Sequence, residues 1–214
     1  KKPLHSQESK NPCIHRKQKN LCIHRKEFPL LKTIIRQIQV LHDSRQPVRI
    51  AIDGRCASGK STLAEQLCQA LPCTVFHMDD FFLRPEQRTA QRYAEPGGNI
   101  DHERFLSDVL EPLKTGSPFS YRPFDCHSMT LGEPVFVEPA EIIIAEGTYS
   151  CHPALWTHYD LHIFLYVSPE EKESRIRSRD PAQAEQFLKK WIPLEERYFA
   201  AYAEQAEYDL RFQT

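Results

Sequence analysis

The chain has 214 residues, of which 40% are hydrophobic and 27% charged, and its formal net charge is −1. These values are typical of one soluble globular domain that is large enough for a sizeable core. No apolar run approaches membrane-spanning length and no signal peptide is recognisable, so we expect a cytoplasmic protein without a membrane partner.

Seven scattered cysteines, an odd number, indicate reduced thiols and not a disulfide framework. The first 26 residues carry eight Lys or Arg and a single acid, Glu8. We expect a basic flexible tail over 1–27 and one domain over 28–214 that begins with a helix over 28–44. A basic tail can touch nucleic acid, but a solvated extension is the simpler interpretation, and we expect no specific nucleic-acid partner.

The tail contains CIHRK twice, at 13–17 and at 22–26. Its cysteines and histidines invite a metal interpretation. The Cys-x-His spacing is shorter than that of common zinc sites, so a duplicated or disordered tail is the favoured interpretation.

The remaining elements follow from apolar periodicity and from Gly and Pro punctuation. We expect helices over 60–71, 102–114 and 169–180, a longer helix through 187–202, and strands over 48–53, 74–78, 119–122, 129–131, 135–137, 141–147, 161–167 and 208–212. Pro193 must lie at a kink or at a second helix start. Strands that alternate with helices predict an α/β fold, a parallel sheet covered on both faces, with ligands at the carboxyl ends of the strands.

The strongest motif is VRIAIDGRCASGKST at 48–62, which contains G-x-x-x-x-G-K-S between a β-branched strand and an amphipathic helix. This spacing is typical of a phosphate-binding loop, in which backbone N–H groups and a helix N-terminus surround a nucleoside triphosphate. Lys60 is expected to reach the β- and γ-phosphates, and the Ser61 hydroxyl to ligate Mg²⁺. The expected cofactors are therefore ATP and Mg²⁺, and the expected nucleotide contacts are Gly54, Ala57, Ser58, Gly59, Lys60, Ser61 and Thr62.

Acidic residues follow two other predicted strands. Asp79 and Asp80 end the strand over 74–78, and Glu146 ends the strand over 141–147. Since carboxyl ends of parallel strands share one edge, we expect these groups to meet the phosphate loop. One carboxylate of the pair could accept the proton of an acceptor hydroxyl, and Glu146 could contact the metal or the substrate.

Arg175 and Arg179 lie one helical turn apart and share a face, an arrangement that suits a lid clamping phosphates. The polar stretch after Asp80 is too long for a simple connection and predicts an acceptor-binding excursion. Within it, Asp101 can cap a helix, and Asp101 and His127 are candidate contacts to an acceptor.

The chain resembles the uridine kinase-like branch of the P-loop kinases, near phosphoribulokinase and pantothenate kinase. The residues that carry the resemblance are the phosphate loop with DDFF at 79–82, NIDHERF at 99–105, YRPFDCH at 121–127, IIIAEG at 142–147 and SRIRSRD at 174–180. The resemblance implies that Asp79 activates a 5′-hydroxyl, that Glu146 lies near the metal and ribose, and that Asp101 contacts the ribose. It also implies that Phe124 and His127 form a base pocket, and that Arg179 and Arg175 belong to the lid.

We therefore expect an ATP-dependent kinase that phosphorylates a hydroxyl of a small molecule, first of all a pyrimidine nucleoside such as uridine or cytidine, in a chain that could form a homo-oligomer. A pantothenate-like or sugar-like alcohol is the alternative acceptor. A nucleotide-switched binding protein or a metallochaperone-like NTPase is the alternative of another class, although the N-K-x-D guanine signature is absent from the sequence.

Overall fold

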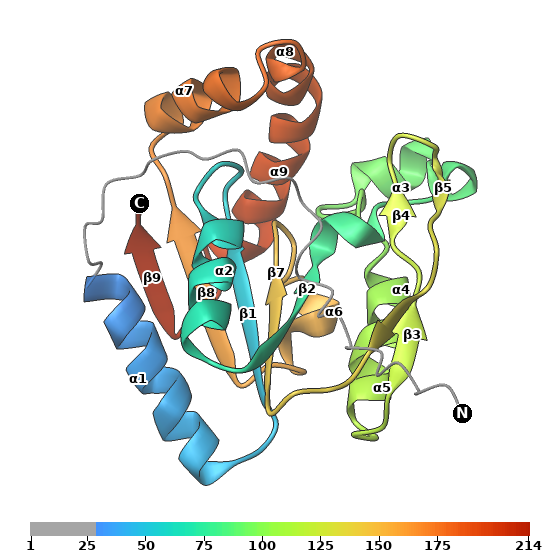
Figure 1. Cartoon of the computed structure of the whole chain (residues 1–214). Coiled ribbons are helices and arrows are strands. Elements are labelled where there is room, and N and C mark those ends of the chain that lie inside the picture. The colour runs from blue at the N-terminus through green and yellow to red at the C-terminus, as the bar shows by residue number, and fades with distance from the viewer. Residues whose placement is uncertain (1–28) are drawn as a thin grey trace, which may run out of the picture.

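The computed structural model describes residues 29–214, and its centre is a five-stranded sheet (Figure 1). The strand order is β2-β7-β1-β8-β9, and every neighbouring pair is parallel. The strands are β1 (Val48–Gly54), β2 (Cys73–His77), β7 (Ile142–Glu146), β8 (Leu161–Tyr166) and β9 (Leu210–Gln213). The expected α/β architecture with a parallel sheet is confirmed.

Two layers of helices cover the two faces of this sheet. Helices α1 (Pro29–Ser44) and α2 (Lys60–Ala70) pack on one face, over alternate β1 residues such as Ile50 and Ile52. On the opposite face, Ala51 belongs to a second core. The helical segments of this core are α4 (His102–Phe105), a π-helical turn (Leu106–Leu110), α5 (Glu111–Leu113), α6 (Pro153–Trp156) and α9 (Ile192–Tyr198). The three central strands β1, β7 and β8 are buried on both sides, which explains their continuous apolar sequences, whereas the edge strands β2 and β9 are only partly buried.

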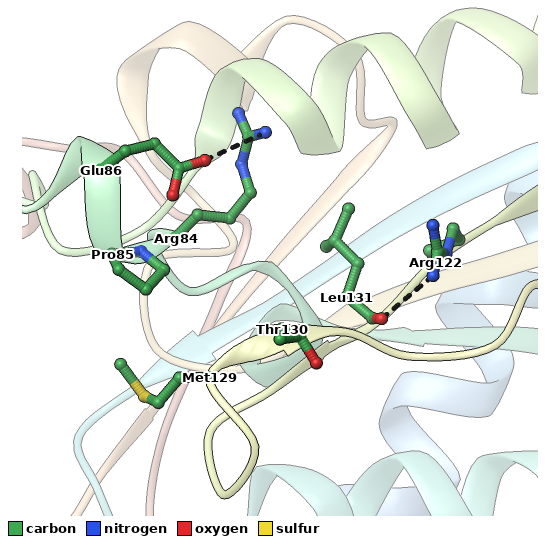
Figure 2. A pocket seen from close by; sticks show the side chains of 7 residues that line it. All are labelled: Arg84, Pro85, Glu86, Arg122, Met129, Thr130 and Leu131. Carbon is green, nitrogen blue, oxygen red and sulfur yellow. Dashed lines mark hydrogen bonds and ion pairs between the residues drawn. The ribbon is translucent and has the colours of Figure 1, made fainter.

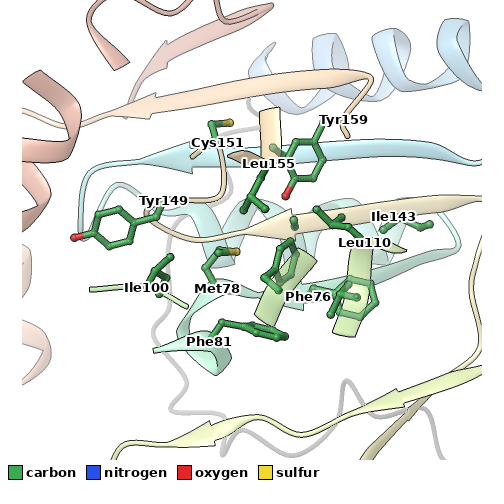
Figure 3. Close-up of a cluster of buried hydrophobic side chains, with 14 of the residues drawn as sticks. Phe76, Met78, Phe81, Ile100, Leu110, Ile143, Tyr149, Cys151, Leu155 and Tyr159 are labelled. Carbon is green, nitrogen blue, oxygen red and sulfur yellow. The ribbon is translucent and has the colours of Figure 1, made fainter. Parts of the chain in front are cut away.

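The second core is aromatic, and it attaches the acceptor-side excursion to the sheet (Figure 3). The Phe81 ring lies 4.9 Å from the Phe105 ring, edge to face, and 5.4 Å from the Tyr121 ring. Phe76 of β2 contacts the same cluster, since its ring lies 5.7 Å from that of Tyr121. These contacts position the segment that follows Asp79 and Asp80.

The excursion is built from short elements beside the edge strand β2 (Figure 1). Two antiparallel pairs form there, β3 (Phe119–Tyr121) with β6 (Val135–Val137) and β4 (Phe124–Asp125) with β5 (Thr130–Leu131). Short helical segments precede them, namely the 3₁₀ turns Met78–Phe81 and Pro85–Gln87 and helix α3 (Ala90–Ala94). Strand β4 and helix α3 were not expected, because segments of two to five residues carry no measurable periodicity.

The C-terminal helices differ from one continuous helix. After α7 (Pro169–Arg179) the chain forms α8 (Ala184–Gln186), a π-helical turn (Phe187–Trp191), α9 and a second π-helical turn (Phe199–Ala203). Pro193 lies in the first turn of α9, where its missing N–H is tolerated, so it marks a second helix start. The expected helix over 102–114 likewise contains a π-helical turn.

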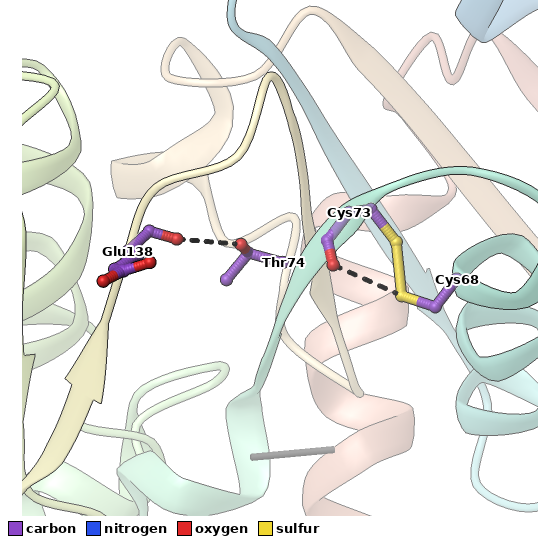
Figure 4. The surroundings of a disulfide bond; sticks show 4 residues. All are labelled: Cys68, Cys73, Thr74 and Glu138. Carbon is purple, nitrogen blue, oxygen red and sulfur yellow. Dashed lines mark hydrogen bonds between the residues drawn. A yellow bond between two sulfur atoms is a disulfide. The ribbon is translucent and has the colours of Figure 1, made fainter. Parts of the chain in front are cut away.

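One expectation about the cysteines is wrong. Cys68 of α2 and Cys73 of β2 form a disulfide, with 5.5 Å between their Cα atoms (Figure 4). The connection between α2 and β2 reverses the chain sharply and brings both side chains together, which an odd count of scattered cysteines does not reveal. Cys56, Cys126 and Cys151 are free thiols.

Two expectations concern other parts of the chain. The tail predicted over 1–27, with its repeated Cys and His residues, lies outside the described residues. Across residues 29–214, no helix combines the length and the apolar character needed to cross a membrane.

Candidate active site

Residues from three neighbouring strands meet at the carboxyl edge of the sheet. The phosphate loop leaves β1 at Gly54, Glu146 ends β7, and Asp79 follows β2 within the 3₁₀ turn. Strand β7 pairs with both others, so that Glu146 lies level with Ile52 on one side and with His77 on the other. The convergence expected from the sequence is therefore present.

The phosphate loop is compact because of its backbone angles. Gly54 has φ 144°, and a Cβ at this position would lie 2.2 Å from the Leu165 carbonyl oxygen. Gly59 has φ 88°, and Ala57 also occupies the left-handed region. Lys60 Nζ donates to the carbonyl oxygens of Gly54 and Arg55 at 2.7 and 2.9 Å. The lysine is thus held inside the loop, at the N-terminus of α2.

Ser61 and Glu146, the two predicted metal ligands, contact each other. Ser61 Oγ lies 3.1 and 3.2 Å from the two carboxylate oxygens of Glu146. His77 Nδ1 lies 2.5 Å from Glu146 Oε1. A hydroxyl and a carboxylate are the hard oxygen ligands that Mg²⁺ prefers, and this ion takes its remaining ligands from phosphates and water. The pair therefore fits Mg²⁺, although residues 29–214 contain no group of three or more His, Cys, Asp or Glu arranged for a metal.

The two acids after β2 differ in environment. Asp79 is exposed. Asp80 is half-buried, and its Oδ2 accepts a hydrogen bond from the Tyr121 hydroxyl at 3.1 Å. The Asp80 carbonyl oxygen accepts a further bond, 2.6 Å long, from Arg104 Nη2. Asp80 thus attaches the acid pair to the acceptor-side excursion, and Asp79 is the more accessible carboxylate.

The two predicted lid arginines both reach the phosphate loop from α7. Arg175 Nη1 donates to the Ala57 carbonyl oxygen at 3.1 Å, and Arg179 Nη2 donates to Cys56 Sγ at 3.9 Å. Arg177 points away, since it pairs with Glu173 and Glu185 on the surface. The helical spacing therefore separated loop-facing from solvent-facing arginines as expected.

The three predicted acceptor residues have separate surroundings. Asp101 is 2% exposed, caps α4 through the Arg104 N–H, and accepts a 2.9 Å bond from Gln87 Nε2. Phe124 is buried under the Arg88 guanidinium, 5.5 Å from its ring centre. His127 is exposed in the β4–β5 turn.

A pocket of about 340 Å³ lies between the Pro85–Gln87 turn and the β4–β5 hairpin (Figure 2). It is lined by Arg84, Pro85, Glu86, Arg122, Met129, Thr130 and Leu131.

Several residues around the loop were missed by the sequence analysis. Asp53 is fully buried beneath Gly54 and accepts hydrogen bonds from three backbone N–H groups and from the Tyr198 hydroxyl. Burial raises the pKa of Asp53, while these donors act to lower it. An acid at the end of a buried strand is a usable signal for this residue.

Glu195 of α9 is the other missed carboxylate beside the loop. Its Oε2 accepts from the Cys56 N–H at 2.8 Å, and burial raises the pKa of its carboxyl group. Its Oε1 has no hydrogen-bond partner among residues 29–214, a situation that costs about 1–3 kcal/mol. No local pattern marks Glu195, because it is far from the loop in sequence and comes close to it only in the folded chain.

The chain is similar in sequence to known kinases. The chain is 33% identical over 159 residues to a uridine kinase from Shewanella piezotolerans, an alignment that covers 66% of this chain and 72% of that protein. It is 34% identical over 140 residues to nicotinamide riboside kinase 2 from Mus musculus, with 61% of this chain and 67% of that protein covered. No protein-family model matches the chain.

The fold is also found among solved structures. A structure described as a possible uridine kinase from Bacillus stearothermophilus superposes with a TM-score of 0.59, over 84% of this chain and 99% of that one, at 20% identity. The parallel sheet, the phosphate loop and the similarity in sequence agree. The chain is therefore an ATP-dependent small-molecule kinase, and it belongs to the uridine kinase-like family of P-loop kinases.

Proposed function

We propose that this kinase transfers the γ-phosphate of MgATP to the 5′-hydroxyl of a pyrimidine nucleoside such as uridine or cytidine. The observation that carries the proposal is the shared sheet edge, where Asp79 follows β2 and the Ser61–Glu146 pair lies beside it. Phosphoryl transfer needs a phosphate cradle and an acceptor-activating group on the same side of the molecule. The kinase domain spans 28–214, and 1–27 is an appendage to it.

The triphosphate is held by the loop residues Gly54, Ala57, Ser58, Gly59, Lys60, Ser61 and Thr62. Ser61 and Glu146 hold Mg²⁺, which neutralises phosphate charge when it is bound. Lys60 exchanges the Gly54 and Arg55 carbonyl oxygens for phosphate oxygens. Arg175 and Arg179 contact loop residues, so they supply two further cations beside the loop for the transferred group.

On the acceptor side, Asp79 accepts the proton of the attacking hydroxyl and orients its oxygen toward the γ-phosphorus. Asp80, Asp101, Phe124 and His127 belong to the acceptor site, and Glu146 contributes a substrate contact beside its metal ligation. Asp101 is engaged with Gln87 and the α4 N-terminus, so it reaches a ribose hydroxyl only when Gln87 moves. The pocket beside Arg84 and Arg122 lies next to the segment that carries these residues.

The relatives support a nucleoside because the uridine kinase and nicotinamide riboside kinase similarities share a riboside as acceptor. A pantothenate-like or sugar-like alcohol remains the alternative acceptor. A nucleotide-switched binding protein is set aside, since both sequence relatives are kinases.

The test is a panel of uridine, cytidine, nicotinamide riboside, pantothenate and simple sugars with MgATP, followed by phosphate transfer. We expect turnover of a pyrimidine nucleoside. Asp79→Asn should lower kcat about 10²- to 10⁴-fold while ATP binding persists, because a general base is removed. Asp43→Asn, an exposed change on α1, is the control. A fully active Asp79→Asn variant, or turnover of pantothenate or a sugar alone, would contradict the proposal.

A further inference from the structure

Helix α9 carries two consecutive carboxylates that contact the first half of the phosphate loop. Glu195 Oε2 accepts a hydrogen bond from the backbone N–H of Cys56 at 2.8 Å. Glu196 forms ion pairs with the Arg55 guanidinium and, at 2.6 Å, with Lys172 Nζ. Neither glutamate belongs to the phosphate-loop motif, so the motif does not explain these contacts.

The stability of the fold gives a poor account of Glu195. The residue is 4% exposed, and its Oε1 has no hydrogen-bond partner among the residues that the structure describes. A buried carboxylate with an unsatisfied oxygen destabilises a protein, and an apolar side chain of similar volume is often at least as stable in such a place. The position of Glu195 therefore points to a role in the loop.

The contact fixes one peptide unit from both ends. The N–H of the Arg55–Cys56 peptide donates to Glu195, and the carbonyl oxygen of the same peptide accepts from Lys60 Nζ at 2.9 Å. Thr148 lies beside both groups, since its single hydroxyl proton can go to the Gly54 carbonyl oxygen at 3.1 Å or to Glu195 Oε2 at 3.4 Å. The Gly54 carbonyl is the second acceptor of Lys60, at 2.7 Å. Glu195 is thus linked to the Arg55 carbonyl through its own peptide, and it shares the Thr148 hydroxyl with the Gly54 carbonyl.

We propose that Glu195 is a positioning residue for the nucleotide: through the Cys56 N–H it fixes the Arg55–Cys56 peptide, and so sets the place of the Lys60 ammonium for the triphosphate. It acts through the backbone and does not contact the substrate. The inference rests on the proposed binding of MgATP to this loop, but it does not depend on which acceptor is phosphorylated.

The experiment is calorimetric titration of the full chain with MgATP, without an acceptor, so that binding is measured apart from turnover. Glu195→Met keeps the volume and removes the hydrogen-bond acceptor, and we expect the Kd to rise about tenfold, or 1.4 kcal/mol. Glu195→Gln still places an oxygen on the Cys56 N–H, so its Kd should stay within about twofold of the unaltered chain. Thr148→Val removes the hydroxyl that Glu195 and the Gly54 carbonyl share, and it should raise the Kd about threefold. Glu185→Gln, on the exposed surface of α8, should leave the Kd unchanged.

The outcomes separate the two proposals. Failure of the unaltered chain to bind MgATP overturns the proposed function and this inference with it. Unaltered binding by Glu195→Met overturns the inference alone, and equal losses in Glu195→Gln and Glu195→Met show that charge, and not the hydrogen bond, is what the loop requires. Circular dichroism checks that each variant is folded. If Glu195→Met does not fold, Thr148→Val must still weaken binding more than Glu195→Gln does.

Discussion

Asp53 shows how much a single buried residue contributes to the shape of the loop. It is fully buried at the end of β1, and its carboxylate accepts from the N–H groups of Gly54, Tyr149 and Cys151 at 2.7 to 3.1 Å and from the Tyr198 hydroxyl at 2.8 Å. The carboxylate therefore joins the phosphate loop to the segment after β7 and to α9.

Replacing Asp53 by Asn tests this role. An amide presents its NH₂ group to donors, so at least one buried hydrogen bond is lost and one N–H group is left unsatisfied. We expect the free energy of unfolding to fall by about 2–4 kcal/mol, measured by urea denaturation. Asp43→Asn on the exposed side of α1 is the matched control. Equal stability of the two variants would show that the four contacts are dispensable.

At the level of elements, a stacked pair of histidines joins the acceptor-side excursion to helix α6. His152 precedes α6 and caps it, since its Nδ1 accepts from the Ala154 N–H at 3.3 Å. Its ring stacks on that of His102 of α4, with 4.0 Å between the ring centres. Tyr198 and Tyr202 complete the aromatic surroundings, and Arg92 and Glu103 are the nearby charges.

This arrangement predicts a loss of stability in mild acid. Burial, with the nearby His102 and Arg92, lowers the pKa of His152 from 6.5 to about 4. The unfolded chain therefore binds a proton below pH 6.5 that the folded chain does not bind, and the contribution to stability falls until about pH 4. Between pH 7 and pH 5 His152 should account for a loss of about 2 kcal/mol in the free energy of unfolding.

The measurement is urea denaturation at pH 7 and pH 5 for the unaltered chain and for His152→Asn. Asparagine keeps a capping side chain but does not titrate in this range. The variant should show a pH dependence that is smaller by about 2 kcal/mol. The same pH dependence in both proteins would mean that His152 is already protonated in the folded state.

For the whole molecule, the loop is the place where both helix layers meet. It begins α2 on one face and contacts α9 on the other through Arg55 and Cys56. A ligand that binds the loop should therefore stabilise the entire fold. At a MgATP concentration of 100 Kd the stabilisation should be about 2.7 kcal/mol, visible as a higher melting temperature.

Removal of the metal should reduce this effect, because Ser61 and Glu146 hold Mg²⁺ only together with the phosphates in our proposal. We expect EDTA to lower the melting temperature in the presence of ATP and to leave it unchanged without nucleotide. Lys60→Met should abolish the ATP-dependent shift, and Glu185→Gln should retain it. An ATP-dependent shift that is insensitive to both EDTA and Lys60→Met would place the nucleotide elsewhere.

Much of this architecture could be predicted because it depends on local patterns. The apolar runs that lead to Gly54 and Glu146 are buried on both faces, and the run before Asp79 is a partly buried edge strand. Such runs can be recognised without tertiary information. The glycine spacing of the loop reflects the need for positive φ angles at Gly54 and Gly59, which lie within one eight-residue motif. The helical spacing of Arg175 and Arg179 likewise predicts a shared face.

Contacts between residues far apart in sequence were decided only by the folded chain. Glu195 reaches Cys56, and His77 reaches Glu146, because parallel strands and a returning helix bring them together. The Cys68–Cys73 disulfide depends on the direction of a short turn, which cysteine counting does not provide. Local sequence thus determined the strands of the central sheet, the phosphate loop and the shared face of Arg175 and Arg179, since their signals lie within one element. The partners of Asp53 and Glu146 were decided by the packing of distant elements beside the loop, since a hydrogen bond depends on distance in space and not on separation along the chain.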